Sequence, residues 1–183
     1  MGSSVLFGLN SKFSIATENT TWATPEVIIG SVPDVGTLYH LKQLPGNVGK
    51  MLALTGTKVR GEDVVSLGLA THFCQSKFVT ELQAELETAP AENIENVLNK
   101  YQDMSKYDGE KANIKTSKLR SISEAYFQPT DICEIVEKVK SEKVGQLAWA
   151  APLSLKTTSR LYTEISSSDY DQALLQSYKV QAY

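Results

Sequence analysis

The sequence contains few of the residues from which metal sites and disulfide frameworks are built. Its 183 residues include two cysteines and two histidines. Cys74 and Cys133 are far apart and match no metal-binding spacing, and His40 has no Cys, His or carboxylate at a suitable distance along the chain. Two free thiols are typical of a protein in a reducing compartment. The sequence therefore predicts no metal site.

Long apolar runs and an excess of positive charge are also absent. No stretch approaches the roughly 18 apolar residues of a membrane span, and residues after Met1 lack the pattern of a signal peptide or an arginine-rich presequence. The net charge is −3, so the overall field does not attract nucleic acid. One basic cluster is interpreted as a solvated loop, with RNA contact as the alternative; it contains Lys111, Lys115, Lys118 and Arg120.

The length and a hydrophobic content of 42% are those of one domain, or of a domain with a helical extension. Residues 1–75 mix strand and helix patterns, and residues 76–183 are mainly helical in pattern. Strands are predicted at 12–17 and 69–74, and helices at 36–44, 48–54, from 61, and around 78–86, 94–101, 132–139, 153–165 and 170–178. Residues 103–118 are polar and lysine-rich, which predicts an exposed loop.

The stretch from Pro25 to Gly36 carries the candidate chemistry. Glu26 and Asp34 stand at opposite ends of an apolar run that Gly30 and Pro33 interrupt. Burial and a second negative charge raise the pKa of a carboxyl group, so such a pair suits general acid/base work. A helix cap and a turn residue are the alternative interpretation, because Pro-Asp is ordinary turn chemistry.

Several short segments share their order with one protein family. They are Phe13-Ser-Ile-Ala-Thr-Glu18, Ala23-Thr-Pro-Glu26, Ile29-Gly-Ser-Val-Pro-Asp-Val-Gly36, Leu52-Ala-Leu-Thr-Gly56 and Gly68-Leu-Ala-Thr-His-Phe73, with looser matches at Trp149-Ala150 and Ser154-Leu-Lys156. In these segments the chain resembles the crotonase (enoyl-CoA hydratase/isomerase) superfamily, and most of all its 3-hydroxyisobutyryl-CoA hydrolase branch. It looks truncated at both ends in comparison with that branch.

The resemblance implies an α/β fold: a partial crotonase-type (ββα) fold, with a core segment at 1–75 and a mainly helical region at 76–183. It implies a coenzyme A thioester as substrate, no cofactor, and a mitochondrial location. Backbone amides would hold the thioester carbonyl in an oxyanion hole, one of them from Ser3. Glu26 would activate water, and Asp34 would lie against the acyl group.

The chain departs from the resemblance at two turns that are rich in glycine in the family. The first reads Gly2-Ser3-Ser4-Val5-Leu6, and the second reads Gly36-Thr37-Leu38. The added bulk predicts a crowded pocket and weak or absent hydrolysis. Members of the same branch also occur in the small subunit of the mitochondrial ribosome. Two functions therefore stay open. One is a structural subunit that contacts other proteins and ribosomal RNA, which these departures and the apparent truncation favour, and the other is an active acyl-CoA thioester hydrolase, which the retained carboxylates favour. In a third possibility, a separate chain supplies the missing strands and rebuilds an active enzyme.

Overall fold

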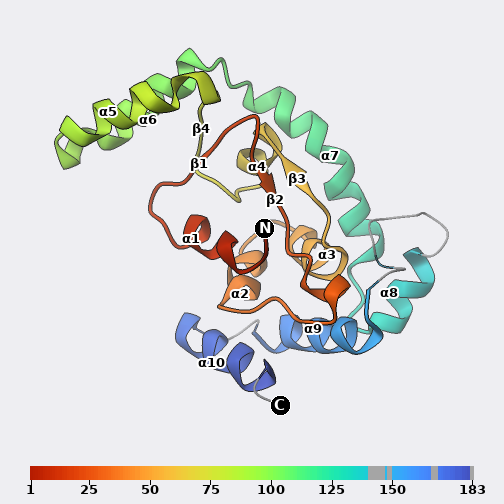
Figure 1. The fold of residues 1–183 in the computed structure, drawn as a ribbon. Coiled ribbons are helices and arrows are strands. Elements are labelled where there is room, and N and C mark those ends of the chain that lie inside the picture. The colour runs from red at the N-terminus through yellow and green to blue at the C-terminus, as the bar shows by residue number, and fades with distance from the viewer. Residues whose placement is uncertain (140–146, 148–149, 166–168, 182–183) are drawn as a thin grey trace. The chain divides into compact units, whose positions relative to one another are not determined.

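The computed structural model describes residues 1–139, 147, 150–165 and 169–181. The chain forms two compact units, each built from separate stretches of sequence. Figure 1 labels their helices and strands. One consists of Met1–Phe7, Ala23–Lys58 and Ser117–Tyr183, and the other of Gly8–Trp22 and Val59–Thr116. The division near residue 75 that the sequence suggests stays a prediction. The two units are described separately below.

The unit that contains Gly8–Trp22 holds two short sheets. Strand β1 (Ile15–Ala16) pairs in parallel with β4 (His72–Phe73), and β2 (Thr21–Trp22) pairs antiparallel with β3 (Val59–Arg60). Helix α4 (Glu62–Ser66) follows β3 and begins with two acidic residues, as a helix amino terminus favours. Strands occur in both predicted places, but they are shorter than the predicted ranges.

Two stretches of this unit form a pair of packed helices, α5 (Val79–Thr88) and α6 (Ile94–Met104). Short 3-10 turns precede them at Ser76–Phe78 and Ala91–Asn93. Leu82, Leu98 and Tyr101 are buried between them, where apolar residues recur at helical spacing. Both helices were predicted from that spacing, and the structure confirms them.

The other unit is a set of helices around one apolar core. Its elements are a 3-10 turn at Gly2–Ser4, the start of α1 (Val5–Leu9), a 3-10 turn at Glu26–Ile29 (η2), α2 (Thr37–Lys42), α3 (Val48–Thr55), the part of α7 (Gly109–Tyr126) from Ser117 on, α8 (Ile132–Val139), α9 (Pro152–Glu164) and α10 (Tyr170–Gln181). Helix α3 packs against both α2 and α9. A Cβ on Gly49 would lie 1.8 Å from the carbonyl oxygen of Leu41, so only glycine permits this approach of α3 to α2.

Helix α7 (Gly109–Tyr126) overturns the prediction of an exposed loop over 103–118. Its buried positions hold mostly small residues, Ala112, Thr116 and Ser123, at helical spacing. The two hydroxyl groups donate to carbonyl groups of their own helix, from Thr116 to Ala112 at 3.1 Å and from Ser123 to Arg120 at 2.8 Å. A search for hydrophobic periodicity does not detect this face, because polar side chains occupy it. Their hydroxyl groups can be buried since they form hydrogen bonds within the helix.

The basic cluster lies on α7 rather than on a loop, and Lys115 forms an ion pair with Asp63 at 3.2 Å. Contact with RNA at this cluster stays a prediction. Among the described residues, no helix is both long and apolar enough to cross a bilayer. Trp149, part of the looser family match, lies outside the described residues.

Candidate functional site

Glu26 is held at the start of a short 3-10 turn. Pro25 precedes it, and Gly30 ends the turn with a φ of 83°, which glycine adopts without steric cost. The amide of Ser31 donates to the carbonyl oxygen of Glu26 at 2.9 Å, which closes the turn. Only 7% of the residue is exposed. Within the described part of the chain, Glu26 Oε2 is buried and has no hydrogen-bond partner.

The surroundings of Glu26 favour its neutral form. Burial raises the pKa of its carboxyl group above the ordinary value, and the negative charge of Asp34 adds to the rise. The backbone amide of Glu26 itself and the amino-terminal ammonium of Met1 act in the opposite direction. A carboxylate whose pKa is raised is a stronger base, which suits it to take a proton and return it.

Asp34 is placed by a strained segment of backbone. Val35 has a φ of 49° and Gly36 a φ of 81°. Positive φ is uncommon for a β-branched residue and is associated with functional sites. The alternative interpretation from sequence, in which the Asp34 side chain caps the following helix, is wrong. Helix α2 has no side-chain cap, and the amide of Thr37 bonds to the backbone carbonyl of Asp34 instead, at 2.9 Å.

The Asp34 side chain instead accepts a hydrogen bond from Ser3. The Ser3 hydroxyl donates to Asp34 Oδ1 at 2.8 Å. The neighbouring Gly2 lies close to the other carboxylate, since a Cβ built on Gly2 would be 3.5 Å from Glu26 Oε1. The turn at Gly2–Ser4 therefore lies beside both acidic side chains, and the structure brings all three predicted site residues together. The Gly2 amide already donates to Ala23, at 3.1 Å. A role for the Ser3 amide in an oxyanion hole stays a prediction.

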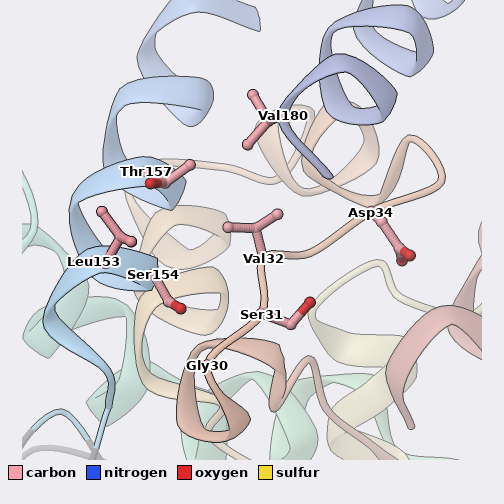
Figure 2. A pocket seen from close by; sticks show the side chains of 8 residues that line it. All are labelled: Gly30, Ser31, Val32, Asp34, Leu153, Ser154, Thr157 and Val180. Carbon is pink, nitrogen blue, oxygen red and sulfur yellow. The ribbon is translucent and has the colours of Figure 1, made fainter. Parts of the chain in front are cut away.

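A cavity of about 510 Å³ opens beside Asp34. Figure 2 shows Gly30, Val32 and Asp34 from the loop after Glu26, Leu153 and Thr157 from α9, and Val180 from α10 around it. Ser31 and Ser154 also line it, so hydroxyl groups and aliphatic side chains alternate around the space. Its volume lies in the ordinary range for small-molecule sites. Glu26 is not among the described residues that line this cavity.

The crowding that the sequence predicted does not occur in this cavity. Leu38 is completely buried and Thr37 is 2% exposed, because both face the core of the helical unit from α2. Leu6 is half-buried. None of the three is among the described lining residues of the cavity. The bulk added after Gly36 is therefore directed into the protein interior and leaves this space open.

Sequence reasoning missed the contribution of α9 and α10 to the cavity wall. Ser154 falls in a segment of the loose family match, but no local motif marks Thr157 or Val180. These positions come to Asp34 only through packing of helices distant in sequence. Among the described residues, no group of three or more His, Cys, Asp or Glu side chains is arranged to hold a metal ion.

Comparisons with known proteins identify the family of this chain. A family model described as enoyl-CoA hydratase/isomerase matches residues 1–183. The chain belongs to this family. Relatives named 3-hydroxyisobutyryl-CoA hydrolase, mitochondrial, from Gallus gallus and Homo sapiens are each 34% identical to it over 190 aligned positions, covering 98% of this chain. The same positions cover 49% of each relative, so the chain spans about half the length of the curated relatives it matches.

Two solved structures show the same fold. A carnitinyl-CoA dehydratase from Mycobacterium thermoresistibile has a TM-score of 0.78 at 24% identity, covering 100% of this chain and 53% of that one. An enoyl-CoA hydratase from Rhodobacter sphaeroides has a TM-score of 0.72 at 24% identity, covering 95% of this chain and 50% of that one. The predicted fold class, a partial α/β crotonase fold with a mainly helical second half, is confirmed.

Proposed function

We propose that this chain carries the carboxylate part of a site that hydrolyses a coenzyme A thioester, with 3-hydroxyisobutyryl-CoA as the substrate. The observation that carries the proposal is the buried Glu26 carboxyl group, whose Oε2 has no hydrogen-bond partner within the described part of the chain. A buried acceptor without a partner is rare in folded proteins and calls for a water or a ligand atom. The names of the relatives supply the substrate class.

In the proposed reaction Glu26 removes a proton from a water molecule, whose oxygen attacks the thioester carbonyl carbon. The carbon–sulfur bond then breaks, and the proton passes from Glu26 to the departing thiolate. The products are the free 3-hydroxy acid and coenzyme A. The upward direction of the Glu26 pKa supports this role, because a more basic carboxylate accepts a proton more readily and its protonated form can return that proton.

The acyl group is proposed to occupy the cavity of Figure 2. Its branched carbon skeleton would contact Val32, Leu153 and Val180, and its polar end would meet Asp34. An oxyanion donor from the Ser3 amide is part of the same proposal. A mitochondrial location is proposed on the names of the relatives.

The second function, a structural subunit of the mitochondrial ribosome, was the one favoured by the sequence. Its support was the truncated appearance of the chain beside that branch, together with the bulk added at the two turns. The added bulk does not line the cavity beside Asp34, and the relatives are named as hydrolases. The hydrolase is therefore the better-supported reading, and partnership with other proteins or ribosomal RNA stays a prediction.

Thioesterase assays test the proposal. The chain should release coenzyme A from 3-hydroxyisobutyryl-CoA, and Glu26→Gln should lower kcat by about 10²–10⁴, the usual effect of losing a general base. Glu137→Gln replaces an exposed carboxylate of α8 and is the matched control. Release that persists unchanged in Glu26→Gln would refute the assigned role, and no release by the parent chain would refute the proposed activity.

A further inference from the structure

The hydrogen bond between Ser3 and Asp34 joins two segments that are 31 residues apart in sequence. It is the one hydrogen bond to the Asp34 carboxylate within the described part of the chain. Asp34 belongs to no helix or strand, and the residues after it have positive φ. Because no regular element fixes its rotamer, the orientation of the carboxylate depends on the Ser3 hydroxyl.

That orientation matters because Asp34 lines two cavities. It lines the cavity of Figure 2 together with Val32 and Ser154. It also borders a second, apolar cavity of about 530 Å³ that Leu174 and Tyr178 line. When Ser3 engages Oδ1, a carboxylate keeps Oδ2 and its lone pairs available for another donor.

We propose that Ser3 is a positioning residue that holds Asp34 so that Oδ2 accepts a hydrogen bond from the hydroxyl group of a 3-hydroxyacyl thioester. This inference rests on the proposed function and specifies its substrate selectivity. Asp34 binds the substrate hydroxyl, and Ser3 acts through Asp34. Asp34 is half-buried. A site that bonds a substrate hydroxyl discriminates against an analogue that lacks it, because the acceptor loses that hydrogen bond in the complex with the analogue.

The experiment compares 3-hydroxyisobutyryl-CoA with isobutyryl-CoA, which lacks the hydroxyl group. Ser3→Ala should lower kcat/KM for the hydroxylated thioester about tenfold more than kcat/KM for isobutyryl-CoA, as the loss of one hydrogen bond to a charged group predicts. Ser3→Thr keeps the hydroxyl and should retain the selectivity. Ser4→Ala is the matched control, because the Ser4 hydroxyl donates to the carbonyl of Met1 at 3.0 Å.

A second comparison asks whether Ser3 acts through Asp34. In an Asp34→Ala background, Ser3→Ala should produce no further loss of selectivity, since the positioned group is gone. An equal loss for both thioesters in Ser3→Ala, or an undiminished effect in the Asp34→Ala background, would overturn the inference.

Binding measurements separate this inference from the proposed function. In a Glu26→Gln background, which suppresses turnover, calorimetry gives the dissociation constants of both thioesters. A Ser3-dependent preference for the hydroxylated thioester supports the inference even if the parent chain hydrolyses neither. Hydrolysis without such a preference refutes the role of Ser3 and leaves the hydrolase proposal standing, and a chain that neither binds nor hydrolyses refutes both.

Discussion

Gly36 and Tyr170 are in such close contact that a Cβ at Gly36 would lie 2.8 Å from a ring carbon of Tyr170. The ring belongs to the first residue of α10, and it also packs edge-on against Tyr39, with ring centroids 5.4 Å apart. Helix α10 is thereby held against the loop that carries Asp34. Because α10 also supplies Val180 to the cavity, this contact helps to define the wall of the candidate site.

Substitution of Gly36 tests that contact. Gly36→Ala should lower the free energy of unfolding by about 2–5 kcal/mol, since a positive φ costs roughly 1–2 kcal/mol and forced overpacking adds about 1–3. Gly30→Ala is the matched control, because Gly30 also has a positive φ of 83° but its Cβ would have nothing within 4 Å. Denaturant unfolding of both variants gives the difference. Equal destabilisation would show that the Tyr170 contact contributes nothing.

The stability of the chain should depend on the ionisation of Glu26. Its folded pKa is raised, so the folded state loses stability as pH rises from the ordinary value of 4.5 through the folded pKa. Glu26→Gln removes this penalty and should raise the melting temperature at alkaline pH, with a gain that shrinks in acid. Thermal melts across pH measure it. A gain of the same size in acid, or a lower melting temperature at alkaline pH, would contradict this assignment.

The elements that sequence predicted well are those with strong apolar spacing. The apolar spacing of Ile132, Ile135 and Val139 predicted α8, and Pro45-Gly46 after Leu44 predicted the break between α2 and α3. The prediction failed at α7, where Thr116 and Ser123 occupy buried positions. Local sequence patterns reveal hydrophobic periodicity and turn residues. They do not reveal a buried helix face made of small polar residues whose hydroxyl groups bond to their own helix.

The candidate site shows the same limit. Glu26 and Asp34 could be found because a motif contains both. The partner of Asp34 could not, since Ser3 is brought to it by the tertiary fold rather than by spacing. The sequence also could not predict where the Thr37 and Leu38 side chains point. Whether they fill a pocket or the core depends on which face of α2 is buried.

Lys42 is expected to stabilise the carboxyl end of α9. Its ammonium group donates to the carbonyl oxygen of Tyr162 at 2.8 Å and lies 5.1 Å from the centroid of that ring. Cations are favourable at a helix carboxyl terminus, where carbonyl groups lack partners in the helix. Lys42→Met should therefore cost about 1–2 kcal/mol of stability. Lys156→Met, at an exposed position of the same helix, should cost far less in the same denaturant titration.

Asp34→Ala separates a binding role for this carboxylate from a structural one. A capping residue would cost about 0.5–2 kcal/mol when removed, but the Asp34 side chain does not cap α2. Its loss removes the bond from Ser3 and also removes a negative charge that raises the pKa of Glu26. These effects oppose each other, so the stability should change by no more than about 0.5 kcal/mol.

Activity should respond differently in the same preparation. If Asp34 contacts the acyl group as proposed, Asp34→Ala should lower kcat/KM for 3-hydroxyisobutyryl-CoA by about tenfold or more while the melting temperature stays close to that of the parent. Measuring both on one sample removes variation between preparations. A variant that is clearly destabilised yet retains its activity would show that Asp34 serves the fold and not the substrate.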